Sequence, residues 1–124
     1  MYSDRYNYYT IQSDLRFTQN IDTKKFIDII LETGFLKEKD HQTFINNEKI
    51  PFMSLFICKV EGGGFAPSRE LPKNINLISI VCTKSKEINQ KIYTDILLSI
   101  STKIGWKVFL EEDENGNEFV EIVV

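Results

Sequence analysis

The 124-residue chain is poor in the residues that most catalytic and metal chemistry requires, with one histidine and two cysteines. Nucleophilic catalysis needs a base beside the nucleophile, usually histidine. The single histidine, His41, ends a run of charged residues from Lys37, which indicates a solvated loop. The chain has no G-x-S-x-G or H-E-x-x-H motif and no His/Cys cluster with metal spacing. We therefore expect a protein that is not an enzyme and that holds no metal or cofactor.

Long apolar runs are also missing. No stretch reaches the roughly 18 residues that a membrane-spanning helix needs, and the N-terminus (Met1-Tyr-Ser-Asp-Arg-Tyr-Asn7) lacks the basic-then-apolar layout of a secretory signal. We expect a cytoplasmic protein with no membrane partner. Cys58 and Cys82 each lie in an apolar run and share no C-x-x-C spacing, which favours buried free thiols over a disulfide or redox pair.

Basic residues are absent from one segment. The formal net charge is −3, which argues against a general nucleic-acid binder. Between Val108 and Val124, however, there is no Lys or Arg, and six acids occur there: Glu111, Glu112, Asp113, Glu114, Glu118 and Glu121. Because the chain has 18 acids and 15 bases in all, the remainder carries 12 acids against 15 bases. The C-terminal segment is therefore an acidic pole on a mildly basic body.

What is present is the composition of a soluble globular domain, 42% apolar and 27% charged. A chain of this length buries roughly two-thirds of its unfolded surface, so it needs no disulfide or metal to fold. We expect residues 1–124 to form one domain.

Two helices are predicted by capping signals and periodicity. Asp22 can cap a helix over about Thr23 to Thr33 that ends at Gly34, after which Phe35 folds back. Ser85 is expected to cap a second helix that ends at Gly105, with Trp106 folding back in the same way. Its core face is predicted to be a ladder at i, i+4: Ile88, Ile92, Ile96, Ile100 and Ile104.

Strands are predicted by alternation and by short apolar runs. They cover Tyr6 to Leu15, Gln42 to Ile45, Met53 to Val60, Ile75 to Thr83, Lys107 to Glu112 and Glu118 to Val124. The last two flank Asn115-Gly116, a dipeptide that favours a tight hairpin turn. The order βαββ thus occurs twice. The predicted class is α+β, a mainly antiparallel sheet with two helices on one face, either as an internal repeat or as a ferredoxin-like variant.

Three surface features have a functional and a purely structural interpretation. The run Gly62-Gly63-Gly64 is followed by Phe65-Ala-Pro67 rather than by Lys-Ser/Thr and a helix, so it predicts a strand connection and not a phosphate loop. The functional alternative is that Phe65 and Arg69 of this loop contact a partner. The carboxylates from Glu111 to Glu114 lead into a turn and do not match a calcium loop, so they are either a solvated turn or a binding patch.

The N-terminal strand carries Tyr2, Tyr6, Tyr8 and Tyr9, side chains that interfaces favour. These rings are predicted either to pack within the sheet or to contact a partner.

Taken together, a small α+β domain with no catalytic set, an acidic hairpin and many Ile, Lys and Asn residues resembles the immunity proteins of bacterial polymorphic toxin and contact-dependent inhibition systems. The nearest local similarity is Lys103-Ile-Gly-Trp-Lys-Val108, followed by the acidic hairpin. The resemblance implies a protein that binds and neutralises a basic toxin domain, and it assigns no functional residue.

The expected function is therefore non-enzymatic protein binding. The residues expected to contact the partner are Glu111, Glu112, Asp113, Glu114, Glu118, Tyr6, Tyr8 and Tyr9. The alternative is a homodimeric structural module or a small-ligand-binding module that uses the exposed face or edge of the sheet.

Overall fold

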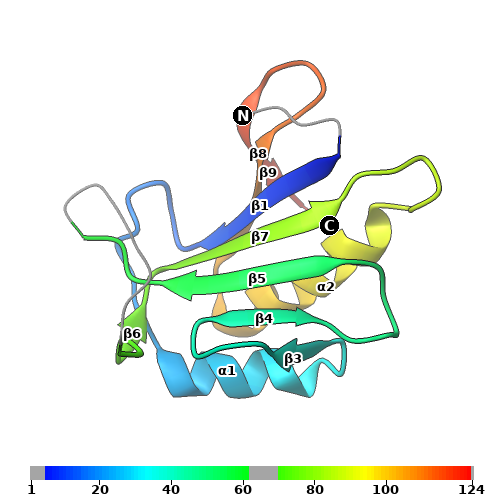
Figure 1. Ribbon diagram of the computed structural model, residues 1–124. Coiled ribbons are helices and arrows are strands. Elements are labelled where there is room, and N and C mark those ends of the chain that lie inside the picture. Colours follow the sequence, from blue (N-terminus) through cyan, green and yellow to red (C-terminus); the bar gives the residue numbers. More distant parts are fainter. Residues whose placement is uncertain (1–4, 62–69, 124) are drawn as a thin grey trace.

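Residues 5–61 and 70–123 of this computed structural model form two helices, a seven-stranded sheet and a small two-stranded sheet (Figure 1). The elements, in chain order, are β1 (Tyr6–Gln12), β2 (Ile21–Asp22), α1 (Thr23–Glu32), β3 (Leu36–Glu38), β4 (Thr43–Asn46), β5 (Met53–Cys58), β6 (Asn74–Ile75), β7 (Leu77–Thr83), α2 (Lys91–Ile104), β8 (Lys107–Glu112) and β9 (Glu118–Ile122). The predicted α+β class is confirmed.

The large sheet has the order β3-β4-β5-β7-β1-β8-β9, and every neighbouring pair is antiparallel. Strands β5, β7, β1 and β8 follow the ferredoxin-like pattern. In this pattern α1 lies in the connection from β1 to β5, and α2 lies in the connection from β7 to β8. The two chain halves do not take equivalent places. The strand that directly follows α2 lies beside β1, whereas the last strand of the first half lies beside β7.

Both helices cover the same face of this sheet. Their connections start from antiparallel strands and run in opposite directions across the sheet, so two right-handed crossovers place both helices on one side. In Figure 1, α2 passes behind the central strands and α1 lies along β3 and β4. The side chains between the layers form the core, with Ile11, Leu55, Ile78 and Ile80 fully buried.

Helix α1 begins and ends as its sequence predicts. The carboxylate of Asp22 accepts a hydrogen bond from the Lys25 amide at 2.9 Å, which satisfies one of the free N–H groups of the first turn. The chain leaves the helix through Gly34 at φ +80°, a conformation that glycine adopts without strain. The Thr23 amide also donates to the Lys73 carbonyl at 2.9 Å, beside the β2-β6 pair, which fixes the start of α1 to the chain before β7.

Helix α2 begins at Lys91, so the prediction that Ser85 caps it is wrong. The Ser85 hydroxyl accepts from the Glu87 amide within a separate turn, and Asn89 accepts from the Lys91 amide at 3.0 Å. Gln90 is held against the sheet, because its side chain donates to the Thr83 carbonyl at 2.8 Å. This hydrogen bond holds residues 85–90 outside the helix, so α2 begins five residues later than predicted.

The predicted isoleucine ladder is right at its centre and wrong at one end. Ile96 and Ile100 are buried, together with Tyr93 and Leu97, but Ile92 is 40% exposed. Ile88 lies before the helix, and each i, i+4 step advances about 40° around a helix, so the row that starts at Ile92 begins outside the core. The buried residues of α2 are Tyr93, Ile96, Leu97, Ile100 and Ser101. The predicted end of the helix is confirmed: Gly105 has φ +72°, and Trp106 packs back into the core.

Three short strands were not predicted. β3 lies within the charged stretch after Phe35, and β2 and β6 are two residues each. β3 forms because Leu36 fills the core while the next residue faces away, and it pairs with β4 through Leu36 and Asn46. Strands this short are decided by tertiary contacts and leave no alternation in the sequence.

The Ile96 packing is testable by truncation. Ile96→Ala should lower the free energy of unfolding by about 2–5 kcal/mol, because it leaves a cavity between α2 and the sheet. Ile92→Ala on the same helix is the matched control and should cost much less, since this side chain is partly in water. Urea unfolding measures both. A loss below about 0.5 kcal/mol for Ile96→Ala, the range of surface substitutions, would contradict the packing of α2.

The two thiols give a second test. Cys58 and Cys82 are free and fully buried, and burial raises the pKa of Cys58 to about 11 and raises that of Cys82 further. Since thiolate is the reactive form, neither residue should react with a thiol reagent in native buffer, and both should react in denaturant. Mass spectrometry of the labelled chain measures how many cysteines have reacted under each condition. Labelling of either cysteine at the rate of a free thiol in the folded protein would contradict it.

Candidate functional site

Strands β8 and β9 form the predicted hairpin, with β9 at the edge of the sheet; we call residues 107–122 the acidic hairpin. Its turn projects at the top of Figure 1. Asp113 organises the turn, because its carboxylate accepts from the Asn115 amide and from both the backbone and the side chain of Asn117, at 2.9 to 3.0 Å. These bonds, chiefly the one from the Asn117 side chain, hold the pKa of Asp113 below its usual value.

The remaining carboxylates of the acidic hairpin point to different sides. Glu112 and Glu118 are directly opposite each other across β8 and β9, an arrangement of like charges that weakens a strand pair. Glu111 lies on the other face, beside the side chain of Phe109 by alternation, and its half-burial raises its pKa. Glu114 is exposed at the turn. Glu121 lies 3.8 Å from the Lys107 ammonium, an exposed pair of little energetic weight.

Phe119 interrupts the middle of the edge strand. Its φ is +50° and its side chain is 45% exposed, between Glu118 and Glu121. A bulky residue in the left-handed region is uncommon and costs backbone energy. The exposed edge of the sheet therefore combines acids with one strained, accessible aromatic ring. The sequence analysis did not single out this residue, because its pattern is that of an ordinary alternating strand.

The three described tyrosines of β1 are divided between the two faces of the sheet. Tyr9 is 3% exposed, its hydroxyl donates to Gln90 Oε1 at 3.4 Å, and burial raises its pKa to about 12. It is part of the core beneath α2. Tyr6 and Tyr8 lie on the opposite face, where Tyr6 is 39% exposed and meets Phe52 edge-on with ring centroids 6.2 Å apart. Only these two tyrosines offer side-chain surface to a partner.

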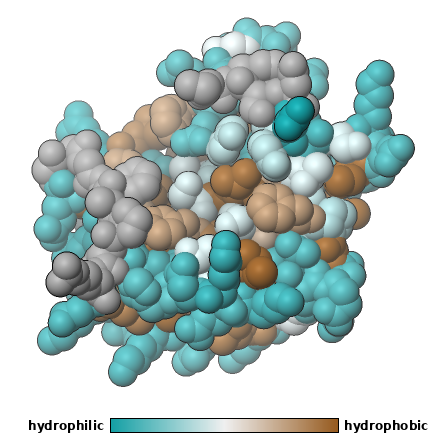
Figure 2. Space-filling model, in the orientation of Figure 1, coloured by the Kyte–Doolittle hydropathy of each residue, from teal (hydrophilic) through white to brown (hydrophobic). Residues whose placement is uncertain are grey.

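The second surface is the face of the sheet that no described helix covers, which we call the helix-free face. Figure 2 shows hydrophobic side chains gathered in its middle and hydrophilic ones towards its lower rim. The strand registers identify the residues at its centre, all of them half-buried: Ile45, Ser54, Phe56, Ser79, Val81 and Tyr8. An exposed face of the sheet was predicted as the alternative binding surface, but its residues could not be named, because they depend on the strand registers.

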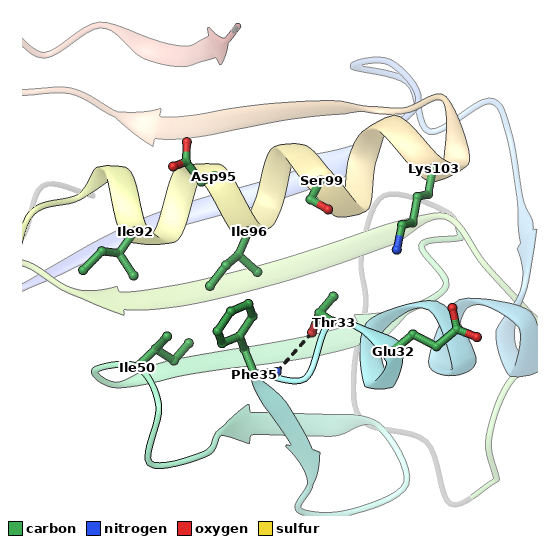
Figure 3. Close-up of a pocket in the computed structure, with 9 residues that line it drawn as sticks. All are labelled: Glu32, Thr33, Phe35, Ile50, Ile92, Asp95, Ile96, Ser99 and Lys103. Carbon is green, nitrogen blue, oxygen red and sulfur yellow. Dashed lines mark hydrogen bonds between the residues drawn. The ribbon is translucent and has the colours of Figure 1, made fainter.

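A hollow of about 500 Å³ lies between α1 and α2 (Figure 3). Phe35, Ile50, Ile92 and Ile96 point towards one another across it, and Lys103 reaches over its other end. Two residues of its lining, Thr33 and Phe35, also form the end of α1, where the Phe35 amide donates to the Thr33 hydroxyl at 3.3 Å. The other residues that line the hollow are polar or charged: Glu32, Thr33, Asp95, Ser99 and Lys103.

The described residues contain no group of three or more His, Cys, Asp or Glu that could hold a metal ion. His41 lies exposed in the loop between β3 and β4. Neither described helix is both long and apolar enough to cross a bilayer. Tyr2 and the loop features at Gly62-Gly63-Gly64, Phe65 and Arg69 lie outside the described residues.

Comparisons of this chain with protein-family models, with curated proteins and with solved structures find no match. Its function must therefore be argued from its own surfaces.

Removing the Asp113 carboxylate tests its part in the turn. The folded state lowers the pKa of this group, so its stabilising effect is present above the ordinary value of 3.8 and disappears as the pH falls through the lowered pKa. Asp113→Ala should lower the melting temperature at neutral pH, and the difference from wild type should shrink in acid. Glu114→Ala is the control, one residue away and exposed. Equal melting temperatures for wild type and Asp113→Ala at neutral pH would refute the assignment.

Proposed function

We propose that this chain is a cytoplasmic, non-enzymatic protein-binding domain that neutralises a cognate toxin, and that the acidic hairpin binds a basic surface of that toxin. The resemblance to immunity proteins supplies the expected class of partner. What supports the proposal most is the placement of the acids: no Lys or Arg lies between Val108 and Val124, and the carboxylates occupy both sides of an edge hairpin.

The pair Glu112 and Glu118 bears most directly on this argument. Like charges directly opposite one another weaken a hairpin, and the exposed Glu114 adds a further negative charge at the same end. A basic partner would reduce this repulsion, because its positive charges would lie beside the two carboxylates. The loss of repulsion would then stabilise the complex relative to the free domain.

The two kinds of residue at this edge would act at different stages of binding. Negative potential accelerates encounter with a basic partner and excludes acidic ones, while buried aromatic side chains provide most of the lasting affinity. The exposed carboxylates of Glu114 and Glu118 would attract the partner, and the exposed ring of Phe119 on β9 would pack against it. Asp113 would contribute mainly by fixing the turn.

The hollow of Figure 3 favours one other function, the binding of a small apolar ligand between the helices. The two functions predict different responses. A small ligand would raise the melting temperature of the pure protein and be weakened by Ile92→Glu in the wall of the hollow. A protein partner bound at the acidic hairpin would be insensitive to that substitution.

Charge reversal tests the proposed function on a partner captured from the native lysate. The double variant Glu114→Lys/Glu118→Lys should fold normally and associate with that partner about 10- to 1000-fold more slowly at low salt, because steering is reversed. Glu48→Lys/Glu87→Lys is the matched control, with the same change in net charge at two exposed residues outside the hairpin. Stopped-flow kinetics at several salt concentrations measure the on-rates.

Two kinetic results would overturn the proposal. One is an unaltered on-rate for the hairpin variant at low salt. The other is an equal loss in the control variant, which would mean that net charge matters and the hairpin does not.

A further inference from the structure

The centre of the helix-free face has a regular pattern of large and small side chains. Across the central pair β5-β7, Ser54 is opposite Val81 and Phe56 is opposite Ser79. One row further along, Thr83 donates its amide to the Phe52 carbonyl. On the helix-free face of this pair, therefore, a larger residue on one strand faces a smaller one on the other, and the larger residue changes strand from row to row.

The row through Val81 ends in opposite charges. From Val81 it runs through Ser54 and Ile45 to Lys37 on β3, and in the other direction through Tyr8 to β8. Glu111 lies at that end, because it shares a face with Phe109, which is opposite Thr10 next to Tyr8. Lys37 is exposed and Glu111 is half-buried. The row is thus basic at one end, apolar in the middle and acidic at the other end.

We propose that a second copy of this chain packs on the helix-free face, related by a two-fold axis that runs along the strands between β5 and β7. Such an axis turns one sheet over the other and exchanges β5 with β7, β4 with β1 and β3 with β8. Phe56 then covers the partner's Ser79, and Val81 covers the partner's Ser54. The same rotation places Lys37 over the partner's Glu111.

Shape and charge both select a second copy as the occupant. The large-over-small pattern lets two identical faces interdigitate at the spacing of about 10 Å typical of packed sheets. The same rotation places the basic end of the row over the acidic end of the partner's row, so each Lys37 meets the partner's Glu111. One two-fold axis therefore gives both the fit of large on small side chains and the pairing of opposite charges. A two-fold axis across the strands would instead place Lys37 over the partner's Lys37 and would repel.

This dimer is separate from the proposed function. It covers Tyr8 and Phe56 and leaves Glu114 and Glu118 at the projecting turn available to another protein. The two proposals can therefore fail independently, since one concerns the mass of the pure protein and the other concerns a captured partner.

A charge swap tests the dimer. Sedimentation of the pure full chain at micromolar to millimolar concentration should give a concentration-dependent mass that approaches twice 14.5 kDa. Lys37→Glu and Glu111→Lys should each weaken dimerisation at least about tenfold, because each places like charges together. The double variant Lys37→Glu/Glu111→Lys should restore it. Within one chain these residues are five strands apart, roughly 24 Å, so the rescue can only act between copies.

Two controls make the result decisive. Lys24→Glu, an exposed residue of α1 on the other side of the sheet, should leave dimerisation unchanged. Ser79→Phe, which places a large residue beneath the partner's Phe56, should abolish the dimer. Folding of each variant is checked by urea unfolding at a concentration where wild type is monomeric.

The proposal is overturned by a mass that stays at 14.5 kDa throughout, or by a dimer that survives Lys37→Glu and Ser79→Phe. It also fails if Ser79→Phe leaves the pure protein unaffected and instead blocks binding of a different protein, since the helix-free face would then belong to that protein.

Discussion

Strand β1 pairs on both sides, with β7 along one edge and β8 along the other, and this double pairing joins the two halves of the chain. It requires that α1 and α2 cross the sheet in opposite directions from antiparallel strands, and right-handed crossovers then place both on one face. The core forms on that face, around Ile11 and Ile80. No described helix covers the other face, and β9 forms the edge of the sheet beyond β8.

Both proposed binding surfaces follow from this one-sided arrangement. The acidic hairpin is the edge of the sheet, where Glu112 and Glu118 oppose each other and Phe119 holds a strained backbone. The helix-free face is the back of the central strands, where Phe56 and Val81 stand beside serines. Edge strands and bare apolar faces both invite association. In this chain the first carries a net negative charge and the second is complementary to itself, so they are suited to different partners.

Local signals predicted the elements, and long-range contacts decided the rest. Asp22, Gly34 and Gly105 act within a few residues of themselves, and the structure uses each as the sequence predicts. Asn115-Gly116 lies in the predicted hairpin, but only Gly116 has a positive φ, and the turn closes between Asp113 and Asn117. The start of α2 depends instead on Gln90 reaching the Thr83 carbonyl, a contact with no local signature.

The candidate site shows the same limit. The charge of the acidic hairpin could be read from composition, but the division of its carboxylates between two faces depends on register. Burial of Tyr9 and exposure of Tyr6 likewise depend on which side of β1 the helices cover. Hydrogen exchange of the captured complex tests the central claim most directly. Slower exchange in the amides of residues 110–121, with little change along α1 and α2, is the predicted result. Protection confined to the helices, with the acidic hairpin unchanged, would contradict the account.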